Sequence, residues 1–133
     1  MITNQIILIL VAILGATSTF HVSTKLKFGP VKSSALLSLI VGILFFILKD
    51  KPSVYLATKI PLAFLGASFV GMTSEARIKS LSLIALSGLI FGIVFLFIQN
   101  PFIFTGFGGG LGTSAFLSVL ATLGIQKFIS KLN

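Results

Sequence analysis

The stretch SLSLIALSGLIFGIVFLFIQNPFIFTGFGGGLGTSAFLSVLATLGIQ, residues 80–126, contains no charged side chain. A helix needs about 20 apolar residues to cross about 30 Å of hydrocarbon. The stretch is therefore too long for one membrane-spanning helix and long enough for two. We expect the break at Gln99-Asn100-Pro101, because Asn caps helix N-termini well and Pro is tolerated at the first helical position. One span is predicted at about 80–98, and the next begins at Pro101.

Three shorter apolar runs precede this stretch, each closed by charged or turn-forming residues. They lie at about 6–20, 33–48 and 54–72, and Gly29-Pro30 and Lys49-Asp50-Lys51-Pro52 separate them. Five spans predict an all-α integral membrane protein. Residues 1–133 are expected to form a single transmembrane domain.

The composition agrees with a chain surrounded by lipid. Charged residues make up only 9% of the sequence and hydrophobic residues 56%, whereas a soluble domain carries roughly a quarter of its residues as charges. The mean hydropathy is +1.15. These values exclude a soluble enzyme, a nucleic-acid-binding domain and a disordered tail. The net charge of +8 sits in the breaks between apolar runs, so nucleic acid is not an expected partner.

The basic residues predict the orientation of the chain, because cytoplasmic loops of membrane proteins are enriched in Lys and Arg. Three cations fall on one side, at Lys49, Lys51 and Lys59. Seven fall on the other side: Lys25, Lys27, Lys32, Arg77, Lys79, Lys127 and Lys131. The N-terminus is therefore expected outside and the C-terminus in the cytoplasm, in a bacterial inner membrane.

An internal repeat is indicated when the sequence is shifted by about 50 residues. Repeat 1 covers about 5–50 and repeat 2 about 54–100, and the fifth span, about 101–130, resembles the first helix of a third copy. The aligned segments are 14–17 with 65–68, 25–27 with 77–79, and 39–45 with 89–95. Copies two spans apart have the same orientation, so the repeat is parallel. Internal repeats are common in transporters.

Small residues recur four positions apart on several spans. The sets are Ser34, Ser38 and Gly42; Ala63, Ala67 and Gly71; Gly88 and Gly92; and Ser114, Ser118 and Thr122. In lipid, helices associate through close backbone approach across such faces. Five short helices do not need all of these faces internally. The pattern therefore predicts a homo-oligomer, a dimer or larger.

The glycine-rich segment is the main candidate site. It contains Gly106, Gly108, Gly109, Gly110 and Gly112, and each glycine costs a helix about 1 kcal/mol relative to Ala. We expect the fifth span to break or bend here and to resume at Thr113 or Ser114, both able N-caps. A broken helix at this depth could bind a permeating solute. Alternatively, the glycines allow a neighbouring helix to pack very close.

Residues 106–113, Gly-Phe-Gly-Gly-Gly-Leu-Gly-Thr, resemble the broken-helix motif of the small dual-topology fluoride channels, Gly-Phe-x-Gly-Gly-Leu-Thr-Thr. The resemblance covers about eight residues and implies an anion pore. Those channels have four spans, with the motif in the third. Here only one helix follows the motif, and the pore-lining Phe residues and the Asn of the second span have no clear match.

Hydroxyl and titratable side chains complete the candidate list. Thr17, Ser18 and Ser68 are predicted to line a weakly polar path, and His21, Glu75 and Arg77 a cytoplasmic mouth. No Asp or Glu lies within a span, which argues against a proton relay or a divalent-cation site. The chain has no Cys, no paired carboxylates and no phosphate loop, so no catalytic residue, metal or cofactor is expected.

The sequence therefore predicts a small membrane transporter or channel for a small ion or neutral solute, acting as a homo-oligomer. One alternative is a non-transporting membrane subunit that packs against a larger complex. A fluoride-channel-like anion pore is a second alternative. A polar cavity reaching residues 106–114 would favour transport, whereas tight apolar packing there would favour a subunit.

Overall fold

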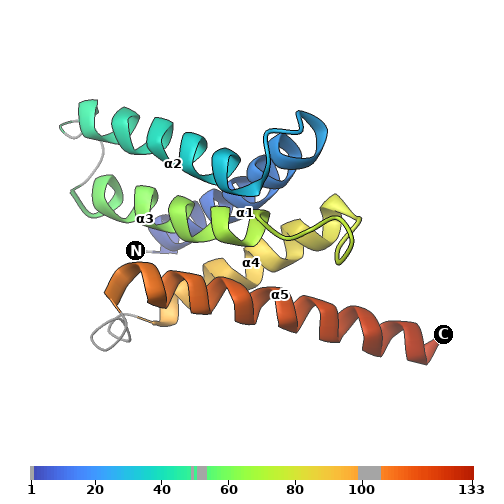
Figure 1. Cartoon of the computed structure of the whole chain (residues 1–133). Coiled ribbons are helices and arrows are strands. Elements are labelled where there is room, and N and C mark those ends of the chain that lie inside the picture. The colour runs from blue at the N-terminus through green and yellow to red at the C-terminus, as the bar shows by residue number, and fades with distance from the viewer. Residues whose placement is uncertain (1, 49, 51–53, 99–105) are drawn as a thin grey trace.

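The computed structural model describes residues 2–48, 50, 54–98 and 106–133. Within these ranges the chain forms five α-helices and no strand (Figure 1). The helices are α1 (Ile2–Lys25), α2 (Pro30–Ile47), α3 (Val54–Gly71), α4 (Leu81–Phe97) and α5 (Gly106–Leu132). The predicted all-α class is confirmed.

Four of these helices are long and apolar enough to cross a membrane: α1, α2, α3 and the 108–132 part of α5. The fourth helix, α4, contains no charged residue but has only 17 residues. These lengths support an integral membrane protein. The predicted start of the fifth span at Pro101 lies outside the described residues.

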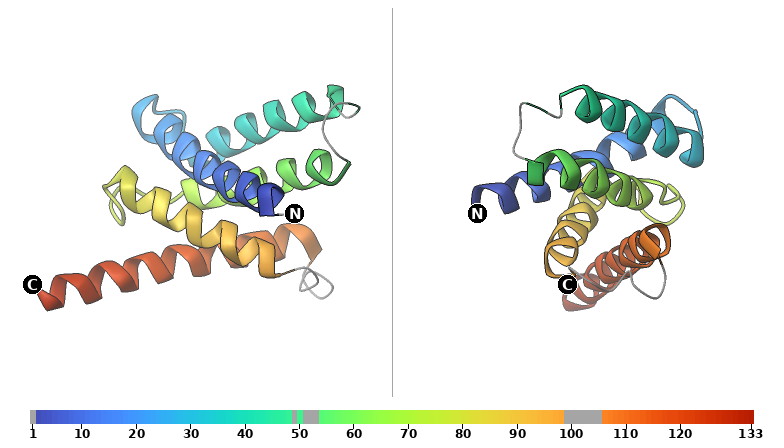
Figure 2. Two further views of the ribbon diagram at one scale, coloured as in Figure 1. Left: turned by 180° about the vertical axis from the view of Figure 1, so that it is seen from behind. Right: turned by 90° about the vertical axis from the view of Figure 1, so that its left-hand side faces the viewer.

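Successive helices of the bundle run in alternating directions. The α1–α2 turn, the α3–α4 turn and the C-terminus lie at one end, and the N-terminus lies at the opposite end (Figure 1). Figure 2 shows that α5 extends beyond the other helices at the end with the two turns. The seven cations grouped by the sequence therefore lie on these two turns, next to them or on the projecting part of α5. We call this the cationic end.

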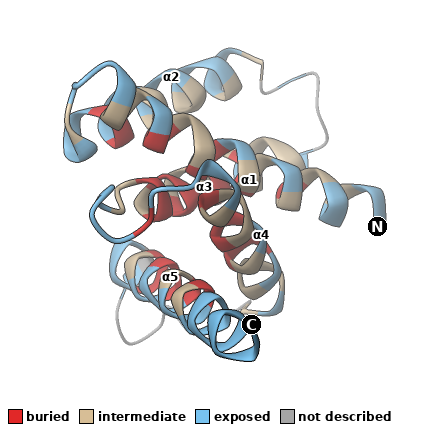
Figure 3. Ribbon diagram, turned by 90° about the vertical axis from the view of Figure 1, so that its right-hand side faces the viewer, coloured by how far each residue is buried: buried red, intermediate tan, exposed pale blue. Residues whose placement is uncertain are grey.

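Helix α1 is the centre of the bundle and packs mainly against α3 and α4. At the crossings the backbones nearly touch. A Cβ atom at Gly71 would lie 2.5 Å from the carbonyl oxygen of Ala16, and one at Gly88 would lie 3.0 Å from the carbonyl oxygen of Ala12. The predicted packing role of the small residues on the third and fourth spans is confirmed. Figure 3 shows the buried residues facing the middle of the bundle, while α2 is largely exposed.

The predicted break in the fifth span is wrong, because α5 is helical without interruption from Gly106 to Leu132. The hydroxyls of Thr113 and Ser114 do not cap a new helix. Each donates to a carbonyl one turn earlier, of Gly109 and Gly110 respectively, at 2.8 Å. The five glycines cost about 1 kcal/mol each, but an unpaired backbone group in lipid costs several kcal/mol. Complete helical hydrogen bonding therefore outweighs the poor helix propensity.

The parallel repeat stays a prediction. In its favour, α4 packs along α1 and α2 along α3, as two copies related by duplication would do. The aligned glycines nevertheless differ in their surroundings. A Cβ at Gly92 would lie 3.1 Å from the Ile9 Cα, whereas one at Gly42 would meet nothing within 4 Å.

The glycine contacts of α1 make a stability prediction. Gly71→Ala is expected to lower the stability of the detergent-solubilised protein by about 1–3 kcal/mol, because the added methyl group forces α1 and α3 apart. Gly124→Ala, on α5, is the matched control. It has open space around it and should be neutral or stabilising by up to about 1 kcal/mol. Thermal unfolding followed by circular dichroism measures both, and equal effects would contradict the packing argument.

Candidate functional site

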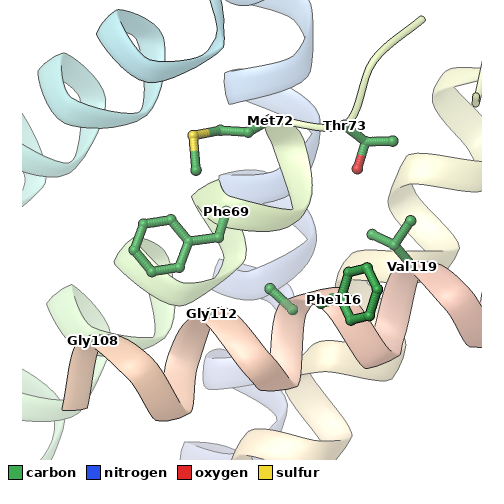
Figure 4. A pocket seen from close by; sticks show the side chains of 8 residues that line it. Phe69, Met72, Thr73, Gly108, Gly112, Phe116 and Val119 are labelled. Carbon is green, nitrogen blue, oxygen red and sulfur yellow. The ribbon is translucent and has the colours of Figure 1, made fainter. Parts of the chain in front are cut away.

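A groove of about 560 Å³ runs between the end of α3 and the first half of α5 (Figure 4). We call it the α3–α5 groove. Its walls are apolar except for the Thr73 hydroxyl, which donates to the Val70 carbonyl at 2.6 Å. The residues lining it are Phe69, Met72, Thr73, Gly108, Gly112, Ala115, Phe116 and Val119.

The groove is open because α5 carries glycines on this face, and a glycine has no side chain to fill the space. Gly108 and Gly112 are four residues apart and therefore lie on the same face of the helix. A Cβ atom at either position would meet nothing within 4 Å. One turn further along, Phe116 is 62% exposed and forms part of the rim.

A second hollow, of about 470 Å³, lies at the cationic end, and we call it the end pocket. Two turns and the end of α1 build it, and its lining is more polar than that of the groove. The residues are Ser23, Thr24, Lys27, Gly29, Pro30, Met72, Thr73, Ser74 and Glu75. Because Met72 and Thr73 also line the α3–α5 groove, the two hollows adjoin.

Local backbone conformation shapes the end pocket. Lys27 has φ 55° and Gly29 has φ 87°, both in the left-handed region, and Pro30 then starts α2. Glycine adopts this conformation freely, whereas a residue with a side chain, such as Lys27, seldom does. On the facing turn, the Ser74 hydroxyl accepts a hydrogen bond from the Ala76 N–H at 3.2 Å. Lys27 and Glu75 bring opposite charges to the same pocket.

The predicted path residues do not gather in one place. Gly108 and Gly112 line the groove, and Gly106, Gly109 and Thr113 are exposed on α5. Gly110 and Ser114 are buried within the packing of the bundle.

On the other helices, Thr17 donates to the Ile13 carbonyl at 2.8 Å and Ser18 to the Leu14 carbonyl. Both hydroxyls bond within α1 and line neither hollow. Hydroxyls of this kind usually satisfy their own helix.

Ser68 belongs instead to a buried cluster of hydroxyls. Its oxygen lies 2.7 Å from that of Ser34 and 3.3 Å from that of Ser38, and it donates to the Leu65 carbonyl at 2.6 Å. A similar link joins Ser87 of α4 to Thr122 of α5 at 2.8 Å. These pairs are sealed between helices, so they hold α2 and α5 in place and contact neither hollow.

Of the predicted mouth residues, Glu75 lines the end pocket, whereas His21 and Arg77 are exposed and do not. Sequence reasoning missed Ser23, Thr24 and Lys27 as pocket residues. The signal that could have found Lys27 is the Gly29-Pro30 turn directly after it, which faces the third-to-fourth-span turn carrying Glu75.

Thr19 is an exception among the buried hydroxyls. Its side chain is fully buried, and its oxygen has no hydrogen-bond partner among the residues that the structure describes. An unpaired buried hydroxyl costs about 1–3 kcal/mol.

Thr19→Val is therefore expected to leave stability unchanged or to raise it, since it removes the unpaired oxygen and keeps the branched shape. Thr122→Val is the matched control and should lower stability by about 1 kcal/mol, because the hydrogen bond from Ser87 that links α4 to α5 is lost. Thermal unfolding in detergent compares the two. A loss of stability in Thr19→Val as large as that in Thr122→Val would show that Thr19 has a partner.

Comparison with known proteins finds no matching family model, no matching curated protein and no matching solved structure. The fold and the two hollows therefore define the class: a helical bundle of membrane-spanning length with a lateral groove next to a polar end pocket.

Proposed function

We propose that the chain is a small membrane transport protein, a channel or carrier, whose solute path follows the α3–α5 groove and opens through the end pocket. One observation supports this proposal: Met72 and Thr73 line both the groove and the end pocket, so the two hollows lie side by side. Together their lining residues extend from the polar end of the bundle to the glycine segment of α5. Apart from Thr19, the buried hydroxyls of the described helices are engaged within or between helices, so the path is placed beside α5 and not through the centre.

The chemistry of the groove favours a solute with apolar surface over a small inorganic ion. A bare ion needs carbonyl oxygens or charged side chains to replace its hydration shell. The α5 backbone remains helical at the glycines, and no charged residue lines the groove. The fluoride-channel-like alternative loses its support, because it required a broken helix at residues 106–113.

We further propose a homo-oligomer that assembles through α2. Only Ser33 and Ser34 of this helix are buried within the chain, and Gly42 presents open space on its surface. The small faces on the third and fourth spans and the Ser114, Ser118 and Thr122 face of the fifth span are used inside the bundle, so we take the exposed α2 as the contact between copies. Orientation with the C-terminus in the cytoplasm of a bacterial inner membrane remains part of the proposal, and a reporter fused after Asn133 tests it.

The α2 contact can be tested by disulfide cross-linking, since the chain has no Cys of its own. Gly42→Cys is expected to give a covalent dimer on mild oxidation in native membranes, because glycine faces permit close helix approach. Leu10→Cys, on the exposed face of α1, is the control and should remain monomeric. Equal cross-linking at both positions would indicate random collision and contradict assembly through α2.

One observation favours the alternative of a non-transporting membrane subunit. Gly108 and Gly112 form a small-x-x-x-small pair with open space above it. Such pairs commonly pack against a helix of another membrane protein.

A flux measurement separates the two functions. The purified chain is reconstituted in liposomes and tested with halides, alkali cations and neutral solutes. Gly112→Leu should lower flux by about tenfold, which corresponds to roughly 1.4 kcal/mol in the barrier, because the side chain fills the groove. Gly124→Leu, also on α5 with open space around it, lies outside the groove and should retain flux. Absence of flux in the unaltered protein, or equal flux in both variants, would contradict transport through the groove.

A further inference from the structure

We propose that the α3–α5 groove and the end pocket together bind an anionic phospholipid of the bilayer, with the phosphate in the end pocket and one acyl chain in the groove. The inference rests on the site of the proposed transport function and names its ligand class. It requires only binding, so it can be tested without any flux.

The length of the groove matches one acyl chain. Its α5 wall extends from Gly108 to Val119, which is about 16 Å at 1.5 Å per residue. The hydrocarbon core of a bilayer is about 30 Å thick, so the groove covers the depth of about one leaflet. Phe69, Phe116 and Val119 offer the apolar contacts that an acyl chain needs, and the exposed rim at Phe116 gives the chain lateral access.

The end pocket offers donors for a phosphate group directly beside the groove. Lys27 contributes an ammonium group, and the hydroxyl of Ser74 accepts from the Ala76 N–H, which leaves its own hydrogen available to donate. Met72 and Thr73 form the boundary between the two hollows. A head in the pocket and a chain in the groove would therefore meet at these residues without crossing a helix.

The charge around the pocket selects the sign of the head group. The two turns and the residues next to them carry a single acid, Glu75, which lines the pocket itself. The cations there are Lys25, Lys27, Lys32, Arg77 and Lys79. The excess of positive charge favours an anionic head group over a zwitterionic one.

Tryptophan fluorescence provides a direct test, because the chain contains no Trp. Phe116→Trp places a single fluorophore on the rim of the groove, at a position exposed enough to accept it. The protein is reconstituted in vesicles that contain a fixed fraction of either brominated phosphatidylglycerol or brominated phosphatidylcholine. We expect phosphatidylglycerol to bind in the groove about fivefold more tightly than phosphatidylcholine, which corresponds to roughly 1 kcal/mol. The brominated phosphatidylglycerol should therefore quench the fluorophore more strongly.

Three variants control the measurement. Leu10→Trp on α1 is 53% exposed and should be quenched equally by both lipids, because it faces the bulk bilayer. Lys27→Gln, added to Phe116→Trp, should remove the preference for phosphatidylglycerol. Lys131→Gln removes a cation from the same end but outside the pocket, and should keep the preference.

Three results of this measurement would overturn the proposal. Equal quenching of Phe116→Trp by both lipids would show that the groove does not select an anionic head. Protection from both lipids would show that a protein helix covers the groove. A preference that survives Lys27→Gln would place the head group elsewhere. A lipid preference without solute flux would leave this inference standing and remove the transport function, whereas flux without a lipid preference would do the reverse.

Discussion

Close backbone contact between α1 and its neighbours α3 and α4 is the constraint on which the rest of the bundle depends. Lipid gives apolar helices little reason to associate, so association relies on contacts that only small residues permit. Gly71 lies against Ala16 and Gly88 against Ala12, so that a methyl group at either glycine would press on a backbone carbonyl. This places α1 in the centre and fixes the relative position of the two hairpins. The α1–α2 and α3–α4 turns then lie at the same end, and the end pocket forms where they meet.

The outer helices α2 and α5 are attached differently, through pairs of buried hydroxyls. Ser34 meets Ser68 between α2 and α3, and Ser87 meets Thr122 between α4 and α5. Such bonds contribute about 0.6–2 kcal/mol in membrane proteins, so they fix the rotation of a helix more than they supply its stability. With Thr122 bonded to Ser87, α5 is oriented so that Ser114, Ser118 and Thr122 face inward. Gly108 and Gly112 then lie beside the open groove.

The sequence predicted the number of helices, their approximate limits and the end at which the cations gather. These features follow from the bilayer, which demands helices of a certain length and favours charged breaks between them. The same constraint explains the error in α5, where helix propensity was given more weight than the cost of unpaired backbone groups in lipid. The groove was only partly predictable. Glycine marked Gly108 and Gly112. The Gly29-Pro30 turn marked the neighbourhood of Lys27, but it did not by itself indicate that Lys27 would share a pocket with residues 72–75. These helices are apolar on every side, so the sequence does not say which face points inward.

Glycine serves two opposite purposes in this fold, and the difference explains where a ligand can bind. At Gly66 the missing side chain is replaced by the Phe91 ring and by Leu111, so the space is filled from within. At Gly112 no part of the described chain takes that place. A hollow that opens sideways into a bilayer is filled by whatever apolar matter surrounds it, and acyl chains are always present at high concentration. Occupancy by lipid therefore needs no special affinity, and selectivity must come from the polar end of the site. Lys27 lines that end and carries the positive charge, so it is the residue that we expect to turn a lipid-filled groove into a specific binding site.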